Sequence, residues 1–520
     1  MAAAVILGDP QTAHVQEGEP ATLDDLFRQA AARRPDAIAL CDPPNRLSFT
    51  DGEPRRLTYA QADHIVSAIA GRLRRLGLAT DSIVALQLPN TAGSVLALLG
   101  VLRAGLIAAP LPLLWRRIDA AAALKRVGAR AIMSSAQIGA TDHCSLGRDI
   151  AAEVFPIRYV CSFGENLPDG VIPLDDLMAA APLLDPPVPA GRDGNPAAHA
   201  AVVTFEVTAD GLMPVARNHM ELIAGGQAVR LEAQLEDNAT ILASCTNSSF
   251  AGLAATTLPW LLSGGTLSLH QPFDAATFAE QCRSDRCNTV VVPGPLVTRI
   301  AQAGLLTHKE LKTILALWRA PERLTAGSAW RHSQAALVDV QAFGETALIA
   351  ARRGPAGDPA EIPLGHVSAP RGASGAGSIL ETAVTDRGTL AARGPMVPQH
   401  PFPPGAERAA MRCFVPDAAG FADTGYPCRA DRASAELSIT GPPPGIVSVG
   451  GYRFKMEQLQ ELVGRADPDA ILAALPDALA GHRLAGSALE RAPLQQKLDE
   501  LGLNPIVSAA FAQRHRMLHG

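Results

Sequence analysis

The chain has 520 residues, of which 48% are hydrophobic and 18% are charged. At about 100–200 residues per domain this length predicts about three compact units, and the composition is typical of a globular rather than a disordered or collagenous chain. The formal net charge is −6. Because such a chain has no overall attraction for phosphate backbones or anionic lipid, nucleic acid is not an expected partner.

Lysine is scarce. The 45 basic residues include only five lysines, at positions 125, 309, 312, 455 and 497, so any chemistry that needs a lysine must use one of these. Eight cysteines are scattered along the chain, and the one close pair, Cys282 and Cys287, lacks the second ligand pair of a zinc site. No metal site is therefore expected from the cysteines or histidines.

The first residues carry no basic cluster ahead of a long apolar run, so they do not predict a signal peptide. The most apolar stretch, residues 94–115, is interrupted by Arg103, Pro110 and Pro112, which favours a buried helix and strand over a membrane span. We expect a cytoplasmic protein without a membrane-spanning segment.

Strands and helices alternate over the first third of the chain. Helices are predicted at residues 22–36, 60–76, 94–103 and 118–127, and strands at 37–40, 83–88, 106–111 and 131–133. Strands that alternate with helices of this length predict a parallel sheet with both faces covered.

The alternation resumes after a proline-rich link at residues 182–198. Strands are predicted at 200–205, 240–243, 266–269 and 289–292, and helices at 218–232, 250–262, 275–283 and 295–303, which form a second α/β layer. From about residue 362 the chain is rich in Gly and Pro, and short runs such as 388–392 and 436–439 predict a distorted antiparallel β unit. The sequence Gly-Pro-Pro-Pro-Gly at 441–445 predicts a stiff linker into a small terminal unit.

The predicted fold class is therefore α/β, with a large N-terminal portion of two α/β layers and a distorted β unit. A small, shortened α+β domain follows it. The expected boundaries are 1–440 for the large domain, with subparts at about 20–181, 199–360 and 361–440, and 441–520 for the small one.

Single motifs of common enzymes are absent. The chain has no G-x-x-x-x-G-K-[ST] phosphate loop, no G-x-S-x-G nucleophile turn and no H-E-x-x-H zinc motif. Walker-type nucleotidases, α/β-hydrolases and zinc proteases are therefore excluded.

A series of segments in a fixed order nevertheless resembles the adenylate-forming superfamily of acyl- and aryl-CoA ligases, peptide-synthetase adenylation domains and luciferases. The segments are residues 57–60 (LTYA), 83–90, 96–110, 262–267 (LSGGTL), 273–274, 343–346 (FGET), 394–395, 423–425 (DTG) and 449–454. The resemblance implies a large N-terminal portion and a small mobile C-terminal domain. It also implies ATP and magnesium, which activate a carboxylic acid as an acyl-adenylate, and a thiol acceptor, usually CoA.

The resemblance assigns site residues position by position. The ATP- and AMP-binding set is Thr208, Gly211, Arg217, Phe343, Gly344, Glu345, Thr346, Asp423 and Tyr426, and the acyl pocket is lined by Ser248, Ser249, Phe250 and Gly252. Thr208, Gly211 and Arg217 lie in the segment 206–217, which the resemblance predicts to be a phosphate-binding loop after strand 200–205. Small polar residues at 248 and 249 predict a wide or polar mouth to the pocket.

Five departures from the family pattern fall on the chemistry. The predicted phosphate loop has no lysine and contains two acidic residues, Glu206 and Asp210. The position of the magnesium-binding glutamate is Ala347, and Tyr426 replaces the aspartate that holds the ribose hydroxyls. Proline replaces the hinge motif at 442–444. The last lysine, Lys497, lies in a helical pattern rather than in a catalytic loop, so no catalytic residue is assigned.

Three hypotheses follow. The preferred one is a ligase-like protein that does not form an adenylate but binds a small carboxylic acid or an acyl thioester, including an acyl-CoA. The second is an active, divergent carboxylic acid–CoA ligase that recruits Arg217 and Glu345 as phosphate and metal ligands. The third is a non-catalytic partner of an active ligase, for which a protein partner or a homodimer is expected.

Overall fold

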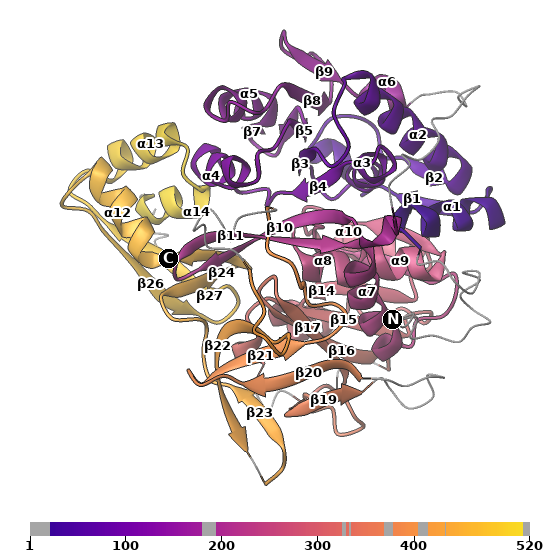
Figure 1. The fold of residues 1–520 in the computed structure, drawn as a ribbon, viewed down its shortest axis with the longest axis vertical. Helices are drawn as coiled ribbons and strands as arrows, with labels where there is room; N and C mark the ends of the chain where they lie inside the picture. Colours follow the sequence, from indigo (N-terminus) through magenta and orange to yellow (C-terminus); the bar gives the residue numbers. More distant parts are fainter. Residues whose placement is uncertain are drawn as a thin grey trace, which may run out of the picture.

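The structure is a computed structural model that describes residues 21–178, 194–324, 329–331, 334–368, 378–403, 414–431 and 433–512. Most of the predicted proline-rich link lies outside these residues. The first α/β layer lies at the top of Figure 1, the second in the middle and an antiparallel β unit at the bottom, with a C-terminal unit at the left. The predicted α/β class is confirmed.

The first layer contains a seven-stranded sheet in the order β11-β10-β4-β3-β5-β8-β9. Its pairs are parallel except β10 with β11. The strands are β3 (Ile83–Gln87), β4 (Ile107–Pro110), β5 (Ala131–Ser135), β8 (Tyr159–Phe163), β9 (Val171–Pro173), β10 (Ala200–Thr208) and β11 (Gly211–Asn218), and a small hairpin pairs β6 (Gln137–Ile138) with β7 (Thr141–Asp142). The helices of this layer are α2 (Tyr59–Arg75), α3 (Ala92–Arg103), α4 (Arg117–Val127), α5 (His143–Glu153) and α6 (Asp175–Met178).

The second layer contains an eight-stranded sheet in the order β17-β16-β15-β14-β12-β13-β1-β2. Its strands are β1 (Ile38–Cys41), β2 (Arg56–Thr58), β12 (Thr240–Ala243), β13 (Thr266–Leu269), β14 (Thr289–Pro293), β15 (Thr313–Trp318), β16 (Ala336–Phe343) and β17 (Ala347–Arg352). Its helices are α1 (Leu23–Arg33), α7 (His219–Ala233), α8 (Phe250–Ala255), α9 (Thr257–Ser263), α10 (Ala275–Ser284) and α11 (Val297–Gln302). Only the two edge pairs, β1 with β2 and β16 with β17, are antiparallel.

Two expectations about the layers are corrected. Strand 200–205, predicted to begin the second layer, is part of β10 and pairs in parallel with β4 of the first sheet. Strand 37–40, predicted in the first layer, is part of β1 and pairs with β13 of the second sheet. Strand order depends on contacts between distant segments, so the alternation of elements predicts a parallel sheet without fixing which sheet takes each strand.

The predicted helix 250–262 is also corrected, because the structure divides it into α8 and α9. Thr256 leaves the helical region, with φ −124° and ψ −80°. Its hydroxyl oxygen lies within hydrogen-bond distance of the Asn247 side-chain oxygen and the Gly252 carbonyl, at 2.8 and 2.7 Å. Pro259 lies in the first turn of α9, where its missing N–H costs no helical hydrogen bond.

The remaining strands form two antiparallel sheets. One has the order β18-β23-β22-β21-β20-β19 and contains β18 (Ile362–Pro363), β19 (Gly365–Ser368), β20 (Ser378–Val384), β21 (Thr389–Arg393), β22 (Ala422–Asp431) and β23 (Glu436–Ile439). The C-terminal sheet, β25-β24-β27-β26, contains β24 (Ile446–Val449), β25 (Tyr452–Lys455), β26 (Ile471–Asp477) and β27 (Gly481–Ser487). It packs with α12 (Met456–Ala466), α13 (Arg491–Leu501) and α14 (Pro505–Ser508).

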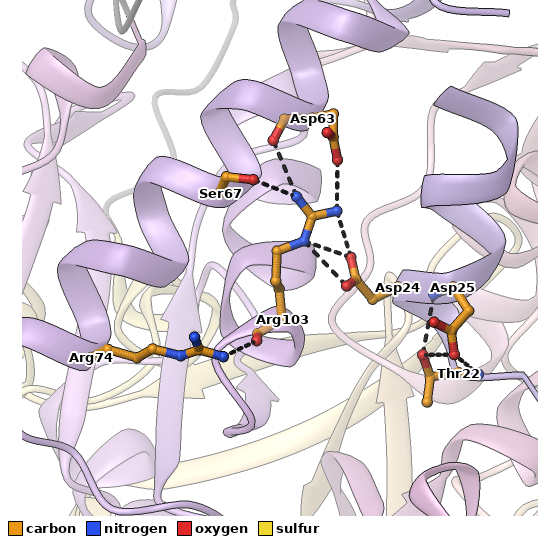
Figure 2. Close-up of polar contacts among 7 residues, drawn as sticks. All are labelled: Thr22, Asp24, Asp25, Asp63, Ser67, Arg74 and Arg103. Carbon is orange, nitrogen blue, oxygen red and sulfur yellow. Dashed lines mark hydrogen bonds and ion pairs between the residues drawn. The ribbon is translucent and has the colours of Figure 1, made fainter. Parts of the chain in front are cut away.

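A buried arginine ties the first three helices together (Figure 2). The Arg103 Nε of α3 donates to Asp24 of α1 at 2.9 Å, and its Nη1 donates to Ser67 of α2 at 2.8 Å. Its Nη2 lies 2.7 Å from the carboxylate of Asp63, also on α2. The guanidinium lies 5.8 Å from the centre of the Phe27 ring. One side chain of α3 thus contacts both α1 and α2 and fixes the three helices relative to one another.

Candidate functional site

A small cavity lies where the two layers meet the C-terminal unit. Its volume is about 60 Å³, and its polar walls are Glu206, Ser248, Ser249, Arg319, Glu345 and Arg453. Binding cavities for drug-sized ligands usually measure about 300–1,000 Å³. The cavity is therefore nearly filled by side chains, and the wide mouth predicted from Ser248 and Ser249 is absent from this arrangement.

The predicted phosphate loop is a β-hairpin. Residues 200–218 pair from Ala200 with Asn218 to Thr208 with Gly211, so only two residues form the turn. The Thr208 hydroxyl donates to the Gly211 carbonyl at 2.8 Å, and Gly211 has φ +109°, which favours glycine. Thr208 and Gly211 thus build the turn of the hairpin, and neither lines the cavity. The loop expectation is wrong because extended pairing satisfies the backbone of this segment.

Glu206, on β10, points its carboxylate into the cavity. One oxygen accepts the backbone N–H of Glu345, and the other forms an ion pair with Arg453 of β25, 247 residues away in the sequence. Gly344 has φ +59°, and a Cβ at this position would overlap the Glu206 carboxylate. The glycine turn therefore lets the backbone of one sheet approach an acidic side chain of the other.

Phe343 ends β16, and Gly344, Glu345 and Thr346 form the turn between β16 and β17. Glu345 turns back toward α8, where its carboxylate accepts the Phe250 N–H at 2.7 Å. Burial, with the neighbouring Glu206 carboxylate, raises the pKa of Glu345. Phe343 is fully buried, and Ala347, where the family pattern has its glutamate, begins β17 with no exposure.

Arg217 does not face the cavity. Its side chain is 2% exposed, its guanidinium lies 3.7 Å from the centre of the Phe250 ring, and it donates to three backbone carbonyls, those of Glu345, Thr346 and Met396. Burial lowers the pKa of Arg217 to about 10, against the attraction of Glu345. Arg217 thus holds the turn after β16 against α8.

Tyr426 and Asp423 lie on β22. Tyr426 is 1% exposed and packs edge-on against Phe343, with ring centres 5.6 Å apart. Burial raises its pKa. Asp423 lies on the exposed side of the strand and accepts the Thr389 hydroxyl and the Gly425 N–H, both at 2.8 Å. The structure therefore places Asp423 apart from the other predicted nucleotide residues.

The predicted acyl-pocket residues begin α8. The Ser249 side chain caps the helix by accepting the Gly252 N–H at 3.1 Å, and it also accepts Arg319 at 2.7 Å. At position 252 a Cβ would overlap the Thr246 carbonyl, so only glycine fits. Ser248 lines both the central cavity and a smaller apolar one of about 30 Å³.

Two arginines of the site were missed in the sequence. Arg319 directly follows β15, and the carboxyl end of a parallel strand is where ligand-contacting residues gather, so its position carried a usable signal. Arg453 belongs to the segment 449–454, which supported the family resemblance but not a site. Burial opposes the charge of Arg453, yet Glu206, Tyr426 and Glu345 together raise its pKa.

None of the five lysines, all of which are described, lines the central cavity. Lys497 donates to the Ala466 carbonyl at 2.6 Å, where it satisfies the C-terminal end of α12.

Within the described ranges, no group of three or more His, Cys, Asp or Glu side chains is arranged to hold a metal ion. In the same part of the chain no helix has the length and apolarity to span a membrane.

Comparisons with known proteins agree with this architecture. A family model described as AMP-binding enzyme matches residues 27–166. The salicyl-AMP ligase / salicyl-S-ArCP synthetase of Mycobacterium tuberculosis is 26% identical over 507 residues, which cover 93% of this chain and 85% of that protein. A match to the beauvericin nonribosomal cyclodepsipeptide synthetase of Beauveria bassiana is 37% identical over 90 residues but spans only 2% of that protein.

Two solved structures share the fold over nearly the whole chain. The amide bond synthetase McbA of Marinactinospora thermotolerans superposes with a TM-score of 0.67 and 18% identity, covering 94% of each chain. MbtA of Mycobacterium smegmatis superposes with a TM-score of 0.63 and 22% identity, covering 94% of this chain and 89% of that one. The match to the AMP-binding enzyme model, the long relative and the shared fold all support the resemblance to the adenylate-forming superfamily, and that resemblance implies the use of ATP or AMP and magnesium.

Proposed function

We propose that this chain is an acyl- or aryl-CoA-ligase-like protein that does not carry out standard ATP-dependent adenylation and instead binds a carboxylic acid or an acyl thioester. The observation that carries the proposal is the ion pair between Glu206 and Arg453. Glu206 lies in the segment where the family resemblance places a phosphate loop, and Arg453 reaches it from β25. The family resemblance implies ATP and magnesium, so the question is whether the residues present suit them.

The charges around the cavity do not suit a triphosphate. Two carboxylates in its wall, those of Glu206 and Glu345, offset the two guanidinium groups of Arg319 and Arg453, and the wall contains no lysine. Two like charges about 4 Å apart repel by about 4 kcal/mol at the effective dielectric constant near a protein surface. A phosphate group beside Glu206 would meet this repulsion unless the Glu206–Arg453 pair opened first.

The arginine that could replace the missing lysine is committed elsewhere. Arg217 donates to three carbonyls and lies against Phe250, so it has no reach into the cavity. The magnesium position also lacks a suitable oxygen, because Ala347 is apolar and the Glu345 carboxylate is bonded to the Phe250 N–H. We therefore derive no step through ATP or magnesium.

We further propose that the segment from residue 441 onward is a separate small domain that closes the cavity with β24 and β25. Arg453 and Tyr452 line the cavity from this side, and the Tyr452 hydroxyl accepts the Leu114 N–H at 3.3 Å. The resemblance to an adenylation-PCP di-domain of a peptide synthetase supports a carrier protein as the partner that presents the thioester.

Pyrophosphate exchange tests the proposal directly. The purified protein should give no exchange above background with ATP, magnesium and a panel of aliphatic and aromatic carboxylic acids. Calorimetry should give no ATP binding tighter than a dissociation constant of about 1 mM, which corresponds to about −4 kcal/mol. Robust acid-dependent exchange would overturn the proposal and favour an active, divergent ligase. An Arg453→Met variant purified in the same way identifies exchange that comes from a contaminating ligase.

A further inference from the structure

The Glu206 carboxylate lies in an arrangement that is built to hold an anion. A backbone N–H from the Gly344–Glu345 turn and the guanidinium of Arg453 both donate to it. Arg319 adds a second guanidinium to the same cavity wall. A turn N–H aimed at the same point as an arginine is a common way to bind a carboxylate or phosphate oxygen.

We propose that Glu206 is an internal substitute for an anionic ligand, and that it makes the cavity select a neutral acyl thioester over a free carboxylate or a phosphate. This inference rests on the proposed function, because it chooses between the two ligand classes named there. It assigns Glu206 as a specificity-determining residue and Arg453 as its positioning partner.

The charge balance of the cavity supports this choice. Glu206 and Glu345 contribute two carboxylates, and Arg319 and Arg453 contribute two guanidinium groups. Arg453 is already paired with Glu206, so an entering anion must either displace Glu206 from its two donors or pair with Arg319 alone, whose Nη2 already donates to Ser249. Displacing Glu206 would leave its carboxylate unpaired in a buried site, which is strongly unfavourable. The carbonyl and sulfur of a thioester carry no net charge, so they can enter while Glu206 stays in place.

The position of Glu206 is fixed by the fold. It lies within β10, paired on one side with β11, and the hairpin turn is only two residues long. The Glu206 side chain is 8% exposed and that of Arg453 is 12% exposed, so bulk water does little to screen the pair. Glu206 therefore cannot move aside as a residue of a long, flexible loop could.

The first experiment asks whether Glu206 occupies an anion site, without any knowledge of the natural ligand. In Glu206→Ala, the removed atoms correspond to acetate, so acetate should fill the space and pair with Arg453. We expect acetate to raise the melting temperature of Glu206→Ala by at least about 2 °C in a saturable manner. Neutral acetamide, and sodium chloride at the same ionic strength, should have no such effect.

Two controls complete this experiment. Wild-type protein, whose site already holds Glu206, and the double variant Glu206→Ala with Arg453→Met, which lacks the cation, should respond to acetate and chloride equally. If Glu206→Ala does not fold, Glu206→Ser is titrated in its place, because it also removes the carboxylate and leaves room for acetate. Equal effects of acetate, acetamide and chloride on the soluble single variant would overturn the anion site.

The second experiment tests the ligand class. Benzoate and hexanoate are compared with their N-acetylcysteamine thioesters by calorimetry. We expect the wild type to bind the better thioester at least about tenfold more tightly than its acid, and Glu206→Ala to lose most of this preference. Equal binding of acid and thioester by the wild type overturns the inference but leaves the proposed function in place. Binding of neither pair refutes the proposed function itself, and the acetate result still decides whether the anion site exists.

Discussion

Replacing Arg103 by Met should greatly destabilise the protein, because it leaves a buried carboxylate without its partner. Asp24 is 5% exposed and receives three of the Arg103 contacts shown in Figure 2, at 2.9, 3.1 and 2.8 Å. Breaking a buried ion pair from one side typically costs about 3–5 kcal/mol. Met keeps much of the volume and the contact with Phe27, so this cost reflects the lost charge rather than a cavity.

The cost should depend on pH in a defined direction. Burial already raises the pKa of Asp24, against the attraction of Arg103. Without Arg103 this pKa rises further, so the folded state holds a proton that the unfolded state releases. A raised carboxyl pKa gives stability that is fully present below the unfolded pKa and is lost as the pH rises through the folded value. The penalty of Arg103→Met should therefore be smaller at pH 5 than at pH 8.

Urea unfolding followed by tryptophan fluorescence measures this effect. Trp260 is fully buried and stacks on Tyr59, with ring centres 6.1 Å apart, next to Phe27. A matched control is Lys312→Met, which removes the same charge from an ion pair whose partners are both 61% exposed. Exposed pairs contribute about 0–1 kcal/mol. Equal shifts of the unfolding midpoint in the two variants, or a penalty that does not change with pH, would refute this reasoning.

Two further predictions concern other buried groups. Burial, together with Arg116, lowers the pKa of His143 to about 4, so the neutral form stabilises the fold above pH 6.5 and this stability is lost as the pH falls. Urea unfolding should show a loss of about 2 kcal/mol in the free energy of unfolding between pH 7 and pH 5. His143→Gln should abolish this loss, whereas His366→Gln, at an exposed histidine, should retain it. Gly344→Ala should cost about 1–2 kcal/mol for its positive φ and more for the overlap with Glu206. The cost that comes from the overlap should disappear in a Glu206→Ala background. Thermal unfolding of the wild type, the two single variants and the double variant measures this, and losses that simply add would contradict the prediction.

The order of helices and strands along the chain could be predicted from the sequence, because each helix or strand depends on the spacing of apolar residues within its own segment. Apolar runs such as residues 83–88 and 240–243 match β3 and β12 closely. The strand at 200–205 was predicted but its continuation into the hairpin 200–218 was not, although the β-branched residues Val202, Val203, Thr204 and Val207 favour a strand over this stretch. The expectation of a loop came from the family resemblance, and the residues themselves carried the better signal.

The site could be predicted only in part. Glu206 was recognisable as a carboxylate out of place in the predicted phosphate-binding segment, and Glu345 was named in the predicted ATP-binding set. Their contacts were not, because Arg453 reaches Glu206 from a strand 247 residues later and Arg217 turns away to bind carbonyl groups. Contacts of this kind depend on how the two sheets and the C-terminal unit meet, which no local pattern encodes.

The Glu206–Arg453 pair itself argues against a purely structural role. Replacing a buried ion pair by apolar side chains of similar volume is often neutral or stabilising by about 1–4 kcal/mol, so packing alone gives no reason for charges here. We predict that Glu206→Leu combined with Arg453→Met keeps the unfolding midpoint of the wild type or raises it, whereas Arg453→Met alone lowers it. The same double variant should lose the preference for a thioester over its acid. A double variant that unfolds as easily as Arg453→Met would instead mean that the pair is needed to close the C-terminal unit onto β10.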